Sequence, residues 1–501
     1  MKHEKLASAL NELSDRHIAE AASKKKKSPF PWISAIAAVL ALAILVGAIW
    51  RPFGKEHSSP VLQTPDIAPP DLNPGVPGGA SQGIHLKYVL ASPTRPQMSP
   101  YPISEAMADY QSWSDDQKAM HSQPSGYADS LEEYFDVILP ALLSSNNQNV
   151  TCSPVNLYMA LAMLAETTDG ESRQQILDLL GADSISDLRI QAGHVWKAHY
   201  NNDGLSTSIL ANSLWLEDGY AYNDATVQRL AESYYASVFQ GDLGSEEMDQ
   251  ALQAWLSEQT GGLLDEYIGN VSMDPNTVLA LASTIYYQVQ WLGSGFSEKK
   301  NTEGMFHGVS GDTAATFMNK ALTYGPYYWG DSFGAVSLAL ENGDRMWLFL
   351  PDEGVTPAEL LKSGQVMDFL KQDPAGYNSS YAQQKSLKVN LSLPKFDVSS
   401  DMEVSNTLKD LGVTDIFDCN TADFTPIIPQ ADEGYVSQVQ HTTRVAIDED
   451  GVTAAAYTLI LRAGAAPPPE DEIDFVLDRP FVFLIESDDG LPLFSGIVNT
   501  I

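Results

Sequence analysis

An uninterrupted apolar run near the N-terminus divides the chain into two parts with different surroundings. Residues 32–50 read WISAIAAVLALAILVGAIW, with no charged residue and a tryptophan at each end. This length is close to the roughly 20 apolar residues of a membrane-spanning helix, and tryptophans are enriched at membrane interfaces. Four lysines, Lys24 to Lys27, precede the run, and only Arg51 and Lys55 follow closely. The positive-inside bias predicts a single-pass plasma-membrane protein with a cytoplasmic N-terminus, residues 1–30, and a transmembrane helix, residues 31–50.

A cleaved signal peptide is the alternative interpretation of the same run. The residues Val46-Gly47-Ala48 would then serve as the cleavage site, and the mature protein would be secreted. The long leader and the length of the apolar run favour an uncleaved anchor. Both interpretations place the large remainder of the chain outside the cytoplasm.

Two regions follow the apolar run. Residues 51–100 contain ten prolines and are rich in glycine and serine. This composition predicts a linker that holds the next domain away from the membrane, and we extend it to residues 51–125. The remainder, residues 126–501, is long enough for one large domain.

The hydrophobic periodicity of residues 126–501 predicts a single α+β domain. Apolar residues recur at helical spacing from Leu131 to Leu142, and a second helix is expected from Pro154. Later segments alternate as strands do, at residues 346–350, 387–393, 443–447 and 481–485. Helices early and strands late indicate an α+β fold rather than βαβ repeats.

Charge and cysteine content exclude several classes of function. The chain has 29 Lys and Arg against 65 Asp and Glu, a formal net charge of −36. Such a protein would be repelled by phosphate backbones, so no nucleic-acid partner is expected. The two cysteines, Cys152 and Cys419, cannot form a disulfide framework, and no metal-binding or dinucleotide motif is present. We expect a monomer without a cofactor.

The segment from Asp448 to Pro469 carries the clearest functional signal. It reads DEDGVTAAAYTLILRAGAAPPP and lies between two strand-like runs. Small residues come first, then a β-prone apolar run, then Arg462 and three prolines. An exposed segment of this kind is accessible to proteases and has the composition of a strand that could join a sheet.

From this segment the chain resembles the serpin family. Residues 449–456, EDGVTAAA, are similar to the serpin hinge, in which a Glu and a Gly precede small residues. Further serpin-like blocks occur in family order over residues 127–501, at 149–154, 211–215, 285–296, 393–396, 411–417, 422–424, 478–481 and 494–496. The resemblance implies a serpin-like fold of early helices, three β-sheets and an exposed reactive-centre loop. With the predicted anchor, it suggests a bacterial-type, membrane-anchored serpin.

The family mechanism gives the expected function. A serine protease cleaves the loop and forms a covalent acyl-enzyme complex, and the cut loop then inserts into the central sheet as a new strand. The protease is trapped and the inhibitor is consumed, so the chain is not expected to be an enzyme. The implied hinge residues are Glu449, Gly451, Val452, Thr453, Ala454, Ala455 and Ala456. By the register that the family resemblance implies, the core-facing residues would be Val452, Ala454, Ala456, Thr458 and Ile460, and none carries a charge that would oppose insertion.

Further residues follow from the resemblance. The implied shutter and breach residues, which flank the site of insertion, are Ser153, Asn156, Ser283, Trp291 and His441. Ser283 stands where many family members have an asparagine that bonds the shutter histidine, and Asn156 is the candidate replacement. Val452 replaces a usual Thr or Ser, and Tyr457 is bulky for the end of the small-residue run.

The expected cleavage site depends on the spacing from the hinge. Serpins are cut about sixteen residues beyond the hinge Glu, which gives the bond between Ala465 and Ala466. A small residue before this bond suits elastase-like or subtilisin-like proteases. The alternative is the Arg462–Ala463 bond, a trypsin-like site that would shorten the inserted strand.

Three other functions remain as alternatives. One is a surface adhesion or structural protein, displayed on the linker, that binds a partner through its acidic faces. A non-inhibitory serpin-like surface protein would keep the fold but bind a partner without loop insertion. A hydrolase would use Ser332 in the motif Gly330-Asp331-Ser332-Phe333-Gly334, which matches G-x-S-x-G. The alternating residues that follow favour a turn between two strands over a nucleophile elbow.

Overall fold

The computed structural model describes residues 83–102, 107–144, 147–269, 271–273, 277–376, 379–430, 434–436, 439–452 and 471–501. These residues belong to the compact unit Ala68–Ile501. In this described part of the chain, no helix is long and apolar enough to cross a membrane. The apolar run expected as an anchor, residues 32–50, lies outside it, as do residues 453–470 of the expected loop.

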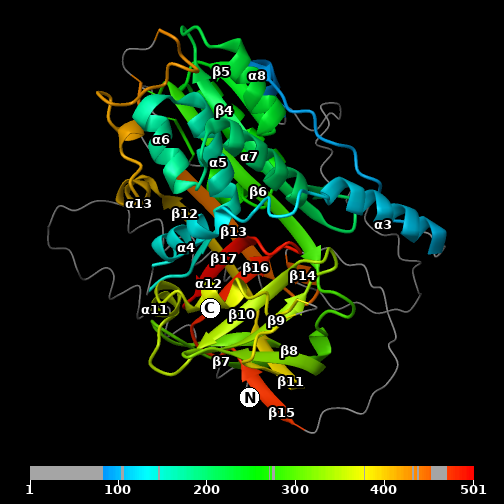
Figure 1. The fold of residues 1–501 in the computed structure, drawn as a ribbon. Coiled ribbons are helices and arrows are strands. Elements are labelled where there is room, and N and C mark those ends of the chain that lie inside the picture. Colours follow the sequence, from blue (N-terminus) through cyan, green and yellow to red (C-terminus); the bar gives the residue numbers. More distant parts are fainter. Residues whose placement is uncertain are drawn as a thin grey trace, which may run out of the picture. The chain divides into compact units, whose positions relative to one another are not determined.

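An eight-stranded sheet forms one half of the fold (Figure 1). Its strand order is β1-β5-β4-β6-β14-β13-β12, and β3 pairs with β4. Both β6 and β13 are antiparallel to the short strand β14 between them, so they are parallel to each other. The strands are β1 (Val89–Ala91), β3 (Asn201–Asn202), β4 (Thr207–Glu217), β5 (Ala236–Gly241), β6 (Leu279–Gln290), β12 (Phe396–Glu403), β13 (Gln440–Ile447) and β14 (Gly451–Val452).

A nine-stranded sheet forms the other half, in the order β15-β11-β8-β9-β10-β16-β17-β2, with β7 paired to β8. Three sheets were expected, but within the described residues hydrogen bonding joins the strands into two. The reason is the 19-residue strand β8, which pairs with β7 near its start, with β9 at its end and with β11 over most of its length. The strands are β2 (Val150–Cys152), β7 (Thr302–Gly308), β8 (Gly311–Trp329), β9 (Phe333–Ala339), β10 (Arg345–Pro351), β11 (Gln384–Pro394), β15 (Glu472–Val476), β16 (Phe481–Glu486) and β17 (Pro492–Val498).

Helices cover the eight-stranded sheet, and the expected early helices are confirmed. Helix α5 begins at Pro154, which needs no amide proton there, and the Ser153 hydroxyl caps it by accepting from the Asn156 amide. Almost every residue of α5 is buried, because it packs on β6 and β17 and against α7. The α-helices are α3 (Met107–His121), α4 (Leu131–Leu142), α5 (Pro154–Thr167), α6 (Gly170–Leu179), α7 (Ile185–His199), α8 (Asp224–Ser233), α9 (Glu246–Gln259), α10 (Asp265–Ile268), α11 (Pro357–Lys362), α12 (Gln365–Leu370) and α13 (Ser405–Asp410); the 3₁₀ helices are η2 (Ile84–Tyr88), η3 (Glu298–Lys300) and η4 (Asp415–Phe417).

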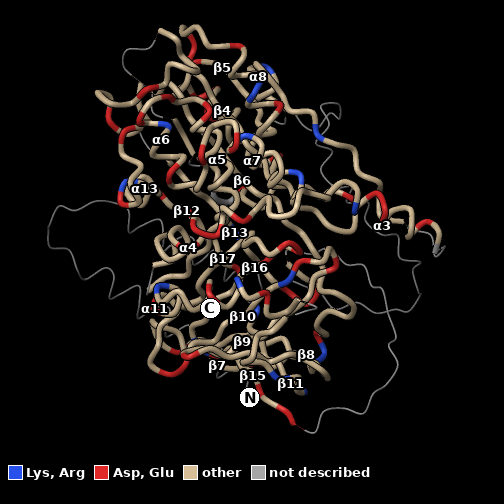
Figure 2. Tube along the Cα trace, in the orientation of Figure 1, with Lys and Arg blue, Asp and Glu red and all other residues tan. Residues whose placement is uncertain are grey.

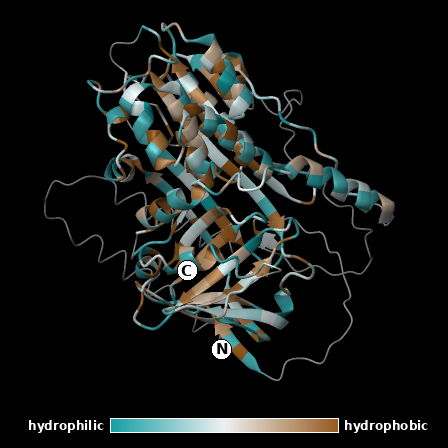
Figure 3. Cartoon of the chain, viewed as in Figure 1, coloured by the Kyte–Doolittle hydropathy of each residue, from teal (hydrophilic) through white to brown (hydrophobic). Residues whose placement is uncertain are grey.

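The central strands are apolar along most of their length (Figure 3). Strands β10, β16 and β17 are buried at nearly every position, so they read as continuous apolar runs rather than alternating ones. The expected strands at residues 346–350, 387–393, 443–447 and 481–485 are confirmed as parts of β10, β11, β13 and β16. Strand β14, which precedes residues 453–470, belongs to the eight-stranded sheet, and β15, which follows them, belongs to the nine-stranded sheet.

Part of the expected linker is built into the fold. Residues 84–91 form η2 and β1, and β1 extends the eight-stranded sheet by pairing with β5. His85 is 4% exposed and Ala91 is 7% exposed, so this segment contributes to the core. The expectation of an unpacked linker over residues 51–125 was therefore wrong at residues 84–91, because this proline-free stretch packs against the sheet and pairs with the distant strand β5.

The G-x-S-x-G segment is a turn between β8 and β9, as the alternation predicted. The Ser332 hydroxyl accepts a hydrogen bond from the Gln365 side chain at 2.7 Å. The segment is followed by a strand rather than a helix, so it lacks the strand-to-helix geometry of a nucleophile elbow.

Candidate functional site

The hinge enters the eight-stranded sheet at β14. Gly451 and Val452 pair with Gln290 and Val289 of β6, and Val452 also pairs with Ile447 of β13. Val452 is 2% exposed. The hinge residues Gly451 and Val452 therefore lie as a strand between the two parallel strands.

A tight turn at Asp448–Gly451 reverses the chain between β13 and β14. The Asp448 amide donates to the Gly451 carbonyl at 3.1 Å. The Asp448 side chain accepts from the amides of Asp450 and Gly451, at 2.8 and 3.2 Å. An aspartate that bonds the amides following it is the usual chemistry of such a turn, and it sets the antiparallel direction of β14.

Gly451 is required by the close approach of β14 to β6. A β-carbon at this position would lie 2.3 Å from the Val289 carbonyl oxygen and 2.7 Å from the Gln290 α-carbon. Both neighbours are backbone atoms, which cannot move aside as a side chain can. A larger residue at 451 would displace β14 from the sheet.

Glu449 is held by two side chains from other elements. Its carboxylate lies 2.7 Å from the Lys395 amine and accepts from the Asn301 amide. Burial opposes ionisation of Glu449, which is 8% exposed, but these partners outweigh it and lower its pKa below the ordinary value. The turn is thereby bound to the start of β12 and to the residue after η3.

Trp291 and Phe296 hold the backbone of the same turn. The Trp291 indole donates to the Asp448 carbonyl, and its amide donates to the Asp450 carbonyl, both at 3.0 Å. The Phe296 amide donates to the Glu449 carbonyl at 2.8 Å. Three successive carbonyls of the turn are thus satisfied by the segment that follows β6, so hinge and β6 are joined at this end of the sheet.

Glu449→Ala is expected to release the turn. The substitution leaves Lys395 and Asn301 without their acceptor, so the free energy of unfolding should fall by about 1–3 kcal/mol. Hydrogen exchange at Gly451 and Val452 should accelerate, because the turn loses its side-chain anchor. Asp450→Ala is the matched control, since Asp450 is exposed. Equal rates of hydrogen exchange at Gly451 and Val452 in the Glu449→Ala and Asp450→Ala variants would show that the Glu449 contacts do not hold the turn.

The shutter residues gather beneath the other end of β6 and β13. The Ser153 amide donates to His441 Nε2 at 3.0 Å. His441 is 2% exposed, and burial lowers its pKa to about 4, so the ring is neutral and accepts this bond. The contact ties the start of α5 to β13.

Ser283 makes a second polar cluster with two asparagines. Its hydroxyl lies 2.6 Å from Asn156 Oδ1 and 2.7 Å from Asn212 Oδ1. The Asn212 amide nitrogen donates to the Tyr234 carbonyl, which orients Asn212. Asn156 thus hydrogen-bonds to Ser283, and among the described residues the hydrogen bond to His441, for which Asn156 was the candidate, is made by the Ser153 amide instead. Sequence reasoning missed Asn212, although it lies within a block used for the family resemblance.

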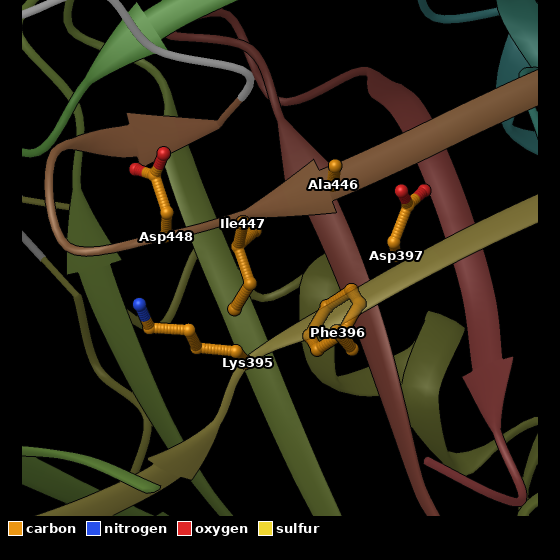
Figure 4. A pocket seen from close by; sticks show the side chains of 6 residues that line it. All are labelled: Lys395, Phe396, Asp397, Ala446, Ile447 and Asp448. Carbon is orange, nitrogen blue, oxygen red and sulfur yellow. The ribbon is translucent and has the colours of Figure 1, made fainter. Parts of the chain in front are cut away.

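A hollow of about 300 Å³ lies beside the hinge (Figure 4). Its lining comes from the facing ends of β12 and β13 and the turn after β13, namely Lys395, Phe396, Asp397, Ala446, Ile447 and Asp448. Lys395 is already paired with Glu449. We therefore assign the hollow to the packing of the hinge and not to a ligand.

The remaining expected site residues lie outside the described part of the chain. These are the hinge residues Thr453, Ala454, Ala455 and Ala456, the expected reactive bond Ala465–Ala466, and its alternative Arg462–Ala463. The structure does bring together Glu449, Gly451, Val452 and Trp291 at one end of the sheet. It also brings together Ser153 with His441, and Asn156 with Ser283.

Comparison with known proteins gives one consistent family. Residues 135–501 match the family model described as serpin, serine protease inhibitor. The chain is 29% identical over 373 residues to Serpin-ZX of Arabidopsis thaliana, covering 71% of this chain and 92% of that protein. It is 26% identical over 373 residues to Plasminogen activator inhibitor 1 of Sus scrofa, covering 71% and 87% respectively.

Solved structures show the same fold. The thermophilic serpin Tengpin in its native state matches with a TM-score of 0.67 at 24% identity, over 81% of this chain and 98% of that one. The native, stressed conformation of the Arabidopsis protein AtSerpin1 matches with a TM-score of 0.64 at 25% identity, over 75% and 99%.

Proposed function

The chain belongs to the serpin family, and from the geometry of its hinge we propose that it is a suicide-substrate inhibitor of serine proteases. A target protease cleaves the loop and becomes covalently attached as an acyl-enzyme. The cut loop then inserts between β6 and β13. The inhibitor is used up in the reaction, so it does not act as an enzyme.

The position of β14 is the observation that carries this proposal. The two strands that flank β14 are parallel to each other, and β14 is antiparallel to both. A longer strand continuing from Val452 would follow the same direction and pair with both neighbours along their length. Each added residue would bring hydrogen bonds and buried apolar area, which favours insertion once the loop is cut.

The proposed reactive bond is Ala465–Ala466, sixteen residues beyond Glu449. This spacing gives an inserted strand of full length, and alanine suits elastase-like or subtilisin-like proteases. Arg462–Ala463 is the alternative and would suit a trypsin-like protease. The acidic surface also favours encounter with a basic protease, because carboxylates outnumber cations over the described elements (Figure 2).

Mixing the full-length protein with an elastase-like protease at equal molarity tests the proposal. We expect a covalent band at the summed mass on a denaturing gel, with release of a peptide that begins at Ala466. A peptide beginning at Ala463 would move the reactive bond to Arg462. Cleavage without a covalent band, repeated with subtilisin-like and trypsin-like proteases, would overturn inhibition and favour a non-inhibitory surface binding protein.

We also propose that the protein is a bacterial-type serpin displayed outside the plasma membrane. The support is the apolar run 32–50 preceded by Lys24 to Lys27. Sedimentation of the expressed protein with membranes, and its digestion by protease added to intact cells, are the expected results. Release of a shortened protein into the medium would favour the cleaved signal peptide instead.

A further inference from the structure

We call residues 83–102 the N-terminal brace. They precede residues 135–501, which match the family model, but they contact helix α9, which lies within the matched region. His85 lies 3.2 Å from the carboxylate of Glu258 and packs edge-on against Phe239, with ring centroids 5.8 Å apart. The Arg95 guanidinium donates to the Gln259 side chain at 2.9 Å. Both contacts fall on the last turn of α9.

The brace is itself anchored to the edge of the sheet. Strand β1 pairs with β5 through Val89 and Ala91. Further along, the Tyr101 amide donates to the Asp203 carbonyl, next to β3, at 2.7 Å. Helix α9 is therefore tied through the brace to one side of the eight-stranded sheet.

The segment after α9, which contains Gly261 and Leu263, contacts both strands between which the loop would insert, β6 and β13. A β-carbon at Gly261 would lie 3.0 Å from the Tyr286 ring of β6, so the backbone lies against that ring. Two residues on, the Leu263 carbonyl accepts from the Arg444 guanidinium of β13 at 2.7 Å. The segment thus contacts both strands that would have to separate.

The strand register shows that the segment after α9 contacts β6 and β13 at a level that an inserting strand would have to pass. Val452 pairs with Val289 and Ile447, and Tyr286 and Arg444 are each three residues before these partners. A strand that continued from β14 would reach the level of Tyr286 and Arg444 after three more residues, about 10 Å along the sheet. Separating the strands there requires the Leu263–Arg444 bond to break or α9 to move.

We propose that the N-terminal brace restrains α9 and thereby slows insertion of the loop. This inference rests on the proposed function, because it concerns the rate of the step by which the protease is trapped. The brace fixes the last turn of α9 from one side, through His85 and Arg95. The Leu263–Arg444 bond then transmits that restraint to β13.

The variant His85→Ala with Arg95→Ala tests this role. The loop is cut with a non-target protease that the protein does not trap, and insertion is followed as the time-dependent rise in thermal stability and the change in Trp fluorescence. We expect insertion to be roughly three- to tenfold faster than in the unsubstituted protein, the range given by loss of one or two part-buried hydrogen bonds. Gln259→Leu removes the same Arg95 contact from the α9 side and should act alike if the double variant folds poorly.

Lys87→Ala is the matched control, because the Lys87–Glu247 pair joins the same two segments but is largely exposed. An insertion rate that is unchanged or slower in the double variant and in Gln259→Leu would overturn the brace. Equal acceleration by Lys87→Ala would also overturn it. Absence of insertion in the nicked protein of every variant, the unsubstituted one included, would instead refute the proposed function on which the inference rests.

Discussion

On the proposed function, replacing Val452 with aspartate is expected to turn the protein from a protease inhibitor into a protease substrate. Val452 is 2% exposed between β6 and β13, in a position with no cation beside it in the strand pairing. A carboxylate there would cost several kcal/mol to bury. The loop would still be cut, but insertion would begin too slowly to trap the acyl-enzyme.

The measurement is the number of inhibitor molecules cleaved for each covalent complex formed. We expect this ratio to rise by roughly tenfold or more for Val452→Asp, since each 1.4 kcal/mol in the insertion barrier changes the rate tenfold. Val452→Thr is the control, because it keeps the β-branched shape without a charge. An unchanged ratio in Val452→Asp would mean that β14 does not lie on the path of insertion.

The second large effect is a loss of stability at acidic pH, caused by protonation of His441. Burial lowers its pKa to about 4, well below the value of about 6.5 expected in the unfolded chain. The folded protein therefore prefers the neutral ring. The stability that His441 contributes is fully present above pH 6.5 and is lost as pH falls from 6.5 to 4.

Comparison with His441→Gln isolates this contribution, because glutamine can still accept from the Ser153 amide but does not titrate. The stability difference between the two proteins, measured by urea unfolding, should change by about 3 kcal/mol between pH 7 and pH 4. His307→Gln is the control, since His307 is exposed and the nearby Asp312 raises its pKa. If the difference in unfolding free energy between the unsubstituted protein and His441→Gln did not change with pH, the His441 imidazole would have the same pKa in the folded and unfolded states.

Local patterns predicted the elements of the domain well. The helical spacing from Leu131 to Leu142 corresponds to α4, and the small-residue hinge begins at a turn that follows β13. Those predictions succeeded because periodicity and turn chemistry depend on residues close together in the chain. The family blocks then located Trp291 and His441 beside the hinge and shutter.

Contacts between residues far apart in the chain could not be predicted from the sequence. Ser283 is 71 residues from Asn212 and 127 from Asn156, so nothing local shows that the three meet. Glu449 finds Lys395 and Asn301 in the same way. Strand β1 was not predicted either, because its pairing with β5 depends on a partner almost 150 residues away.

Because β1 covers the edge of the eight-stranded sheet, the position of a cut in the N-terminal segment determines whether that edge becomes exposed. Without β1, β5 would present the backbone groups around Val238 and Phe239 that now pair with β1. Unpaired strand edges are templates for other chains. A cut before residue 83 would leave that edge covered by β1. A cut after residue 102, or a shortened chain that starts at residue 135 where the family match begins, would expose it and favour self-association.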